Sequence, residues 1–234
     1  MGDVTSIPEQ HSPTDEDLYP SSDGQPMAET DLHIDEMMEL KAMLRHHFKP
    51  RADQMYVASN LFVYYEQGNP RAVFAPDVFV ARGVAQRQRK TYKLWLDGPA
   101  PVFVVEITSK STRLEDKGNK KALCEMLGVT EYFLYDPWGE YLEPPLQGFR
   151  LAADGYKAIA VDDTGALRAD TLGLSLSLDT RGLLEVRDME TGERLLRTDE
   201  HYERAQQASQ EKARADEAER RLAEALAELE RRRH

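Results

Sequence analysis

The feature that most constrains the fold is the run Val102-Phe103-Val104-Val105, which is apolar at every position and ends in Glu106. A strand with one face in water alternates apolar and polar residues, whereas a strand covered on both faces is apolar throughout. This run therefore predicts the central strand of a sheet that has further layers on both sides. The acid that ends it has to be paired, hydrated or bound to a metal, because an isolated buried charge is costly.

The other apolar patterns predict helices and strands around this central strand. Strands are expected at 54–59, 61–66, 75–80, 101–108 and 131–135, and helices at 30–48 and 112–127. Short strands are expected at 149–151, 156–161, 172–178 and 183–187, and a helix without Gly or Pro at 202–233. This order indicates an α/β fold, in which a mixed β-sheet core is flanked by helices and followed by a β extension and a terminal helix.

Composition divides the chain into three segments. Residues 1–29 are rich in Pro, Ser and acids and predict a mobile N-terminal arm, residues 30–196 a folded domain with its β-rich extension, and residues 197–234 a helical tail. One heptad seam of the tail contains Ala208, Glu211, Ala215, Ala218, Leu222, Ala225 and Leu229. Because the seam is mostly alanine, two alternatives stay open: a coiled-coil contact that supports a homodimer, and a solitary helix.

The sequence carries no signal for a membrane or for secretion. No apolar stretch reaches the roughly 18 residues that a membrane span needs, and the N-terminus has neither a basic region nor an apolar one. The single cysteine, Cys124, has no partner for an internal disulfide. These observations predict a cytoplasmic protein.

The charge distribution bears on the partner of the protein. The formal net charge is −12, which by itself argues against nucleic acid. Residues 82–121, however, contain ten Lys or Arg and four acids, so this window carries +6 and the rest of the chain −18. A basic window can be only a solvated surface, but here it surrounds Glu106 and favours a phosphodiester substrate, with DNA as the expected partner.

Two carboxylates are placed to share a cation. Pro76-Asp77 opens one predicted strand, and Glu106 ends the next. Acids at adjacent strand ends can converge on a hard cation such as Mg²⁺, which prefers oxygen ligands. Asp77 could instead cap a turn. A nearby lysine could orient or deprotonate a water, or offset charge in a phosphoryl transition state.

Two strings carry a family resemblance. They read PDVFVARG from Pro76 and PVFVVEITSKSTRLEDKGNKKALCEMLGVTEYFLYDP from Pro101. Together with the lead-in YPSSDGQPMAETDLH, they resemble the bacterial restriction-endonuclease family called Uma-two, formerly a domain of unknown function, in the PD-(D/E)XK superfamily. The resemblance extends from about Tyr19 to Tyr156.

The resemblance implies a restriction-endonuclease-like fold and an endonuclease that hydrolyses DNA phosphodiester bonds with Mg²⁺ or Mn²⁺. It implies that Asp77, Glu106 and the backbone carbonyl of Ile107 are metal ligands. The alternative is a catalytically inactive protein of the same fold that binds DNA or acts as a scaffold.

The position of the catalytic lysine departs from the simplest superfamily pattern. Lysine is expected two residues after the glutamate, where this sequence has Thr108. In the family the lysine function moves to the following helix, which implies Lys120. Lys110 is a second candidate, because it replaces a proline often present in such proteins, and Lys117 is a third.

Further residues could extend this site. Glu29, before the first helix, and Glu66, at the end of the second predicted strand, are candidates for an additional ligand or a water contact. His33 could contact substrate, although a structural histidine is the more ordinary interpretation. The nucleic-acid contacts are expected in the basic loop, at Arg87, Arg89, Lys90 and Lys93.

Overall fold

A computed structural model of the protein describes residues 18–22, 29–108 and 116–233. Backbone contacts divide the chain into two compact units, Met1–Leu195 and Leu196–His234. The helical elements are α2 (Asp31–His47), η1 (Lys49–Arg51), η2 (Asp116–Lys120), α4 (Lys121–Met126) and α5 (Thr198–Arg233). The strands are β1 (Met55–Ser59), β2 (Val63–Tyr64), β3 (Val73–Phe74), β4 (Val78–Arg82), β5 (Tyr92–Lys93), β6 (Phe103–Ile107), β7 (Glu131–Tyr135), β8 (Leu146–Ala152), β9 (Gly155–Ala158), β10 (Leu167–Ala169), β11 (Leu174–Leu178) and β12 (Leu184–Asp188).

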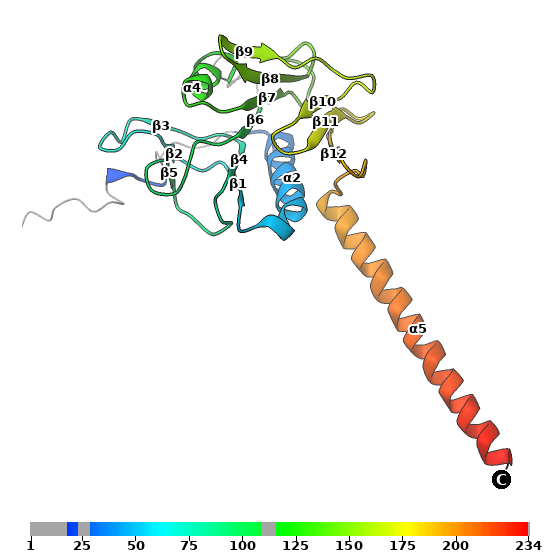
Figure 1. Cartoon of the computed structure of the whole chain (residues 1–234). Coiled ribbons are helices and arrows are strands. Elements are labelled where there is room, and N and C mark those ends of the chain that lie inside the picture. The colour runs from blue at the N-terminus through cyan, green and yellow to red at the C-terminus, as the bar shows by residue number, and fades with distance from the viewer. Residues whose placement is uncertain (1–17, 23–28, 109–115, 234) are drawn as a thin grey trace, which may run out of the picture. The chain divides into compact units, whose positions relative to one another are not determined.

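The first unit is built on a six-stranded mixed sheet with the order β1-β4-β6-β7-β8-β9 (Figure 1). Strands β6 and β7 are parallel, with Phe103 opposite Glu131 and Ile107 opposite Tyr135, and the other neighbours are antiparallel. The chain between β6 and β7 passes through η2 and α4. The predicted central strand therefore lies inside the sheet, and all five of its residues are buried.

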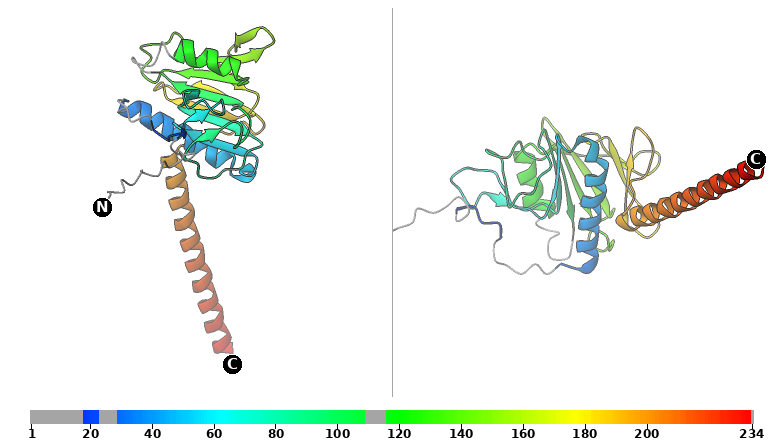
Figure 2. Two further views of the ribbon diagram at one scale, coloured as in Figure 1. Left: turned by 90° about the vertical axis from the view of Figure 1, so that its left-hand side faces the viewer. Right: turned by 90° about the horizontal axis from the view of Figure 1, so that it is seen from below.

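Both faces of the sheet are covered, as the apolar run predicts. On one face, Val105 and Ile107 pack with Leu40 and Leu44 of α2 and with the leucines of a smaller antiparallel sheet, β10-β11-β12. On the other face, Val104 packs with residues of α4 and of a second small sheet, β3-β2-β5. Figure 2 (right) shows the sheet between these two layers. Alternate residues of β6 thus face opposite layers.

The two helices that flank the sheet differ in how closely they follow the prediction. Helix α2 begins at its cap, Thr30, whose hydroxyl accepts a hydrogen bond from the backbone N–H of His33, and it ends before Phe48. The second helix is predicted over 112–127, and residues 112–115 lie outside the described part of the chain. Among the described residues, Asp116–Lys120 forms a π-helical segment before α4. This segment contains Gly118, and glycine is a weak α-helix former.

The N-terminal residues 18–22 are attached to the core, although they fall within the segment predicted as a mobile arm. The ring of Tyr19 is buried and lies 5.0 Å from Tyr64 and 5.2 Å from Trp95, measured between ring centroids. Its hydroxyl accepts a hydrogen bond from the N–H of Gly68, and the Tyr64 hydroxyl donates to the carbonyl of Pro20. Burial of one aromatic ring offsets the cost of ordering this short stretch.

The β extension is joined to the core by two buried glutamates. Glu131, at the start of β7, accepts hydrogen bonds from Arg150 and from the backbone N–H groups of Asp170 and Thr171. Glu36 of α2 accepts a hydrogen bond from the hydroxyl of Tyr135 at 3.2 Å and another from the backbone N–H of Leu184 at 3.3 Å. Buried carboxylates need such donors, and these bonds fix β10–β12 to the sheet.

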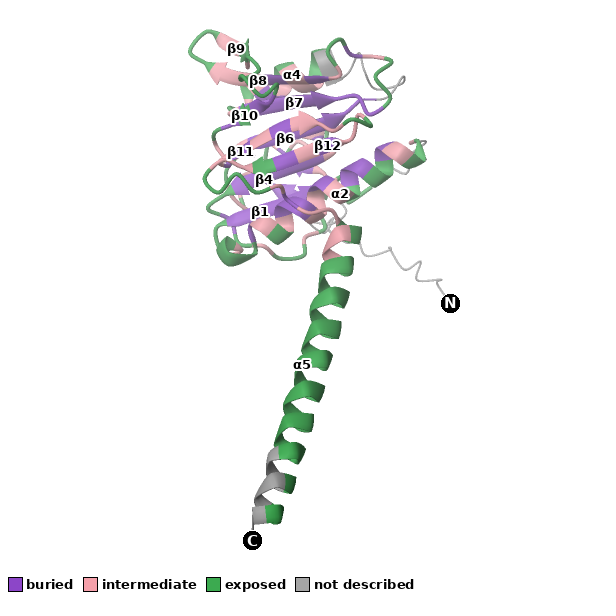
Figure 3. Cartoon of the chain, turned by 90° about the vertical axis from the view of Figure 1, so that its right-hand side faces the viewer, coloured by how far each residue is buried: buried purple, intermediate pink, exposed green. Residues whose placement is uncertain are grey.

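The second unit consists of α5, a helix of 36 residues. Residues 202–225 are all exposed (Figure 3). Ion pairs one turn apart, such as Glu217 with Arg221 and Glu228 with Arg232, stabilise the helix along its own length. In the described part of the chain, no helix combines the length and the apolar character that crossing a bilayer requires.

The whole architecture confirms the predicted class: a mixed α/β sheet flanked by helices, a C-terminal β extension and a terminal helix.

Candidate active site

Asp77 and Glu106 come together at one edge of the sheet. Asp77 directly precedes β4, Glu106 is the fourth residue of β6, and these strands are neighbours. The N–H of Ile107 donates to Oδ2 of Asp77 at 2.7 Å, and the N–H of Asp77 donates to Oε2 of Glu106 at 3.4 Å. Each carboxylate therefore accepts a hydrogen bond from the backbone that carries the other, and the two acids share one location.

Lys120 reaches this pair from the layer that contains α4. Its amine lies 2.9 Å from Oε2 of Glu106, whose side chain is 0% exposed. Glu106 shares its side of β6 with Val104, which packs on the layer that contains α4, so a lysine at the junction of η2 and α4 can reach it. Single π-helical turns within helices are rare and occur frequently at functional sites.

Lys120 is the candidate lysine that the structure brings to Glu106. Lys110 lies outside the described residues, and so does the side chain of Lys117. Cys124, one turn beyond Lys120, is fully buried. Burial raises the pKa of its thiol, the nearby charge of Glu106 raises this pKa further, and Lys120 opposes the shift. This thiol is therefore inert packing beside the acid pair.

The first turn of α2 reaches the same acids. Nε2 of His33 lies 3.5 Å from Oδ1 of Asp77, and Nδ1 lies 3.3 Å from Oε2 of Glu29. The side chain of His33 is 4% exposed. Glu29 is thus linked to Asp77 through His33, whereas Glu66 is not brought to the site: it lies in the turn after β2, where its carboxylate accepts a hydrogen bond from Asn69.

The donor atoms at this edge of the sheet suit a hard cation. Two carboxylates and the carbonyl of Ile107 are oxygen ligands of the type that Mg²⁺ and Mn²⁺ take. Thr108 adds a buried hydroxyl on the same side of the strand as Glu106, and its oxygen has no hydrogen-bond partner among the described residues. Within that part of the chain, no three His, Cys, Asp or Glu side chains cluster as a metal site. A cation here would therefore use two acids, the main chain and water.

The basic loop supplies fewer surface charges than its sequence indicates. Arg89 is buried against the ring of Tyr56, with its guanidinium carbon 4.2 Å from the ring centroid, and pairs with Asp97. Lys93 is buried against Tyr19. Both cations therefore pack against aromatic rings of the fold.

Two members of the loop remain at the surface. The side chain of Arg87 is 64% exposed and lies 3.2 Å from Asp97, and Lys90 is exposed. Of the four cations expected to contact nucleic acid, Arg87 and Lys90 are therefore the two that the fold leaves accessible.

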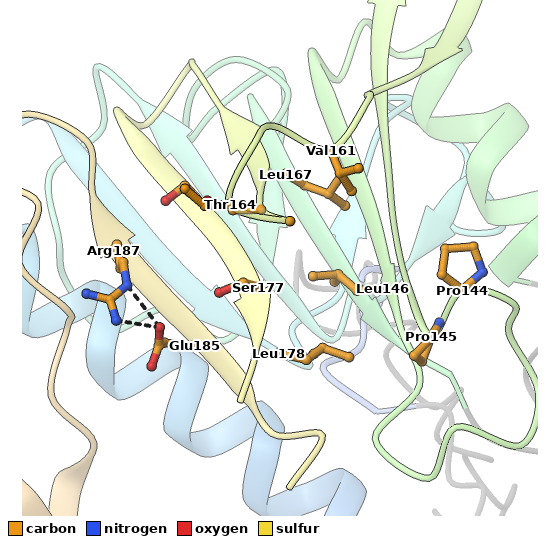
Figure 4. A pocket seen from close by; sticks show the side chains of 13 residues that line it. Pro144, Pro145, Leu146, Val161, Thr164, Leu167, Ser177, Leu178, Glu185 and Arg187 are labelled. Carbon is orange, nitrogen blue, oxygen red and sulfur yellow. Dashed lines mark hydrogen bonds and ion pairs between the residues drawn. The ribbon is translucent and has the colours of Figure 1, made fainter. Parts of the chain in front are cut away.

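A cavity of about 490 Å³ lies on the β extension (Figure 4). Its walls include Pro144, Leu146 and Leu167, and the Glu185–Arg187 ion pair stands at its side. None of the predicted site residues lines it. The acid pair is therefore a separate feature of the molecule.

Sequence reasoning did not single out Trp138, which contacts the N-terminus of α2. Its indole N–H donates to the hydroxyl of Thr30 at 3.5 Å, and its side chain is exposed. No local pattern marks this contact, because the two residues are 108 positions apart.

A family model and one solved structure resemble this chain. The model of the Uma2 family, described as "Putative restriction endonuclease", matches residues 15–181, which is more than half of the chain. Among solved structures, one that resembles the chain is "a putative nuclease belonging to DUF820" from Anabaena variabilis ATCC 29413, with a TM-score of 0.46 and 13% sequence identity, over 63% of this chain and 76% of that chain. A search of curated proteins finds no match.

Proposed function

The chain belongs to the Uma2 family, whose description as restriction endonucleases supports nuclease function, and from this premise we propose that it is a divalent-metal-dependent endonuclease acting on DNA. The observation that carries the proposal is the meeting of Asp77, Glu106 and Lys120. These residues come from β4, β6 and the η2–α4 junction, so the fold has to be complete before they meet. The site we propose is of the PD-(D/E)XK type, with its lysine on the helix.

Asp77, Glu106 and the carbonyl of Ile107 are proposed to hold Mg²⁺ or Mn²⁺. When bound, such a cation polarises a phosphoryl oxygen and makes a bound water a better nucleophile. The chain supplies the rest. Lys120 offsets negative charge that develops on the phosphoryl group and orients the attacking water. Glu29, linked through His33, is a candidate for a water contact at the same edge.

Arg87 and Lys90 are proposed to contact the DNA backbone. They are the two loop cations at the surface, and phosphate contacts depend on accessible Lys and Arg. We further propose that the protein acts in the cytoplasm, and that α5 supports a homodimer.

An inactive nuclease-fold protein is the second candidate function. Thr108 favours it, because this residue occupies the position at which the superfamily expects lysine. Such a protein would bind DNA without cleaving it. The two functions differ in one observable, which is turnover.

The deciding experiment is nicking of supercoiled plasmid DNA with Mg²⁺ or Mn²⁺. Wild type is compared with Asp77→Asn, Glu106→Gln and Lys120→Met, and with Glu66→Gln as a matched control, since Glu66 is a surface glutamate away from the acid pair. We expect each site variant to lose roughly 100-fold or more in rate and the control to keep its rate. Nicking that is equal in all five proteins would assign the activity to a contaminant.

Two further outcomes distinguish the candidate functions and substrates. If wild type nicks with neither cation but retards DNA in a gel, the inactive binding protein is the correct assignment. An RNA of the same sequence, run in parallel, shows whether the substrate is DNA alone.

A further inference from the structure

We propose that His33 is a positioning residue that holds the Asp77 carboxylate in the orientation the cation requires; this rests on the proposed metal-dependent function. His33 lies in the first turn of α2 and is 3% exposed, so its ring is part of the interior and not a surface group. Its Nε2 atom faces Oδ1 of Asp77 at 3.5 Å. A buried imidazole in this place needs polar partners, and the site acid is one of them.

The two oxygens of Asp77 are held from two different elements. The N–H of Ile107, on β6, fixes Oδ2 at 2.7 Å. In the described part of the chain, His33 is the one group that faces Oδ1 within ion-pair distance. The carboxylate of an aspartate rotates about a broad torsion, so one hydrogen bond alone leaves its plane free to turn. His33 supplies the second point that fixes the plane.

His33 is itself fixed by the N-terminus of α2. Its backbone N–H donates to the hydroxyl of Thr30, and the same hydroxyl accepts from the indole of Trp138. The backbone of Trp138 is bonded to Asp136, which accepts four backbone N–H groups within its own turn. The N-terminus of α2 is therefore hydrogen-bonded to the turn that follows β7.

These contacts lead back to the strand that carries Glu106. The turn after β7 adjoins β6, because the N–H of Thr108 donates to the carbonyl of Tyr135 at 2.7 Å. Trp138, in the turn after β7, contacts Thr30 at the cap of α2. His33 of α2 contacts Asp77, and Asp77 in turn accepts a hydrogen bond from Ile107 of β6. His33 is therefore held at several points, and it can restrict the orientation of the Asp77 carboxylate.

The chemistry of imidazole suits this role. One ring nitrogen can donate to Asp77 while the other faces Glu29 at 3.3 Å, and the ring has few internal degrees of freedom. Groups that orient a metal-ligating carboxylate change metal affinity by roughly 10- to 100-fold when they are removed. His33 should therefore act on the affinity for the cation, with a smaller effect on the rate at saturating cation.

The experiment measures Mn²⁺ binding by calorimetry, and plasmid nicking over a range of Mn²⁺ concentrations, with the full chain. His33→Leu fills the space without a donor, and His33→Gln restores an amide donor. His47→Leu is the matched control, because His47 lies on the same helix and also faces a carboxylate, Asp188, at 3.7 Å. We expect His33→Leu to weaken Mn²⁺ binding about 10-fold or more, His33→Gln to recover most of the loss, and His47→Leu to bind as wild type does.

The contrary outcomes are distinct. Equal Mn²⁺ affinity in wild type and His33→Leu overturns the positioning role alone. An affinity lost equally in His33→Leu, His33→Gln and His47→Leu, together with a lower melting temperature, assigns His33 to folding and also overturns it. Absence of Mn²⁺ binding by wild type overturns the proposed metal-dependent function and this inference with it.

Discussion

The amine of Lys120 lies 2.9 Å from the carboxylate of Glu106, which is fully enclosed at the end of an otherwise apolar strand. A buried carboxylate without a counter-charge would destabilise the sheet at its centre. Lys120 supplies this charge from the junction of η2 and α4. The pair that we assign to catalysis therefore also supports the fold, and substitutions within it should change stability as well as activity.

Replacing Lys120 by Met should lower the free energy of unfolding by about 3 kcal/mol, because it leaves the buried Glu106 uncompensated. The double variant Lys120→Met/Glu106→Gln should recover much of this loss. Urea unfolding measures both. Millimolar Mg²⁺ should raise the melting temperature of Lys120→Met more than that of wild type, since a cation can replace the missing charge.

Lys121→Met is the control for this prediction. Its ammonium stands 3.4 Å from the centroid of the Phe149 ring and is not paired with a site acid. We expect a loss of about 1 kcal/mol or less, and no change in the response to Mg²⁺. A Mg²⁺ response that is the same in both lysine variants would contradict a cation site at Glu106.

The central strand and its acid could be predicted from sequence because the information is local. Four consecutive apolar residues followed by Glu106 specify a covered strand that ends in a charge, and Pro76-Asp77 marks the start of its neighbour. Nothing local distinguishes Lys110, Lys117 and Lys120. The family resemblance favours Lys120, and its contact with Glu106 is made from a π-helical turn that no spacing rule predicts.

The rest required tertiary structure. Arg89 and Lys93 read as surface cations in a basic loop, but each covers an aromatic ring contributed by a distant segment. The contact between Trp138 and Thr30 joins a turn to a helix cap far away in the chain. Such pairings are set by packing, and a single sequence does not contain them in any fixed spacing.

Glu131 should be essential for stability and dispensable for catalysis. It is as buried as Glu106, but its donors are Arg150 and the backbone of the β extension. Glu131→Gln should cost about 3 kcal/mol, because it weakens a charge-assisted network. Below the melting temperature, nicking per folded molecule should equal that of wild type. Asp154→Asn, at an exposed ion pair with Lys157, should change neither quantity. Loss of nicking in folded Glu131→Gln would place this acid in the site.

Stability should fall as the pH is lowered through the range in which His47 titrates. Burial lowers the pKa of His47 below its ordinary value of 6.5, and although Asp188 opposes this shift, the net direction is downward. The unfolded chain therefore takes up the proton first, so the contribution of His47 is present above about pH 6.5 and is lost as the pH falls below that value. Urea unfolding at pH 7.5 and pH 5.5 should show the decrease.

His47→Gln should reduce this pH dependence, because the variant has no proton to take up at that position. His46→Gln is the matched control: His46 is the exposed neighbour on the same helix. Its charge is the smallest of the effects that lower the pKa of His47, so its replacement should change the dependence far less than His47→Gln does. The same slope in wild type and in both variants would show that His47 does not contribute.

Helix α5 should hold two copies of the chain together. Its residues 202–225 are all exposed, and in isolation such a helix gains stability only from its own ion pairs. Pairing along the alanine and leucine seam would bury Leu222, which is 61% exposed. Removal of residues 203–234 should therefore reduce the mass in sedimentation equilibrium from a dimer to a monomer. Leu222→Lys, which places a charge on the seam, should do the same, whereas Ala223→Lys, one residue along and off the seam, should leave the dimer intact. If the mass of the full chain already equals that of the truncated monomer, α5 is a solitary helix, and the homodimer has no support from this element.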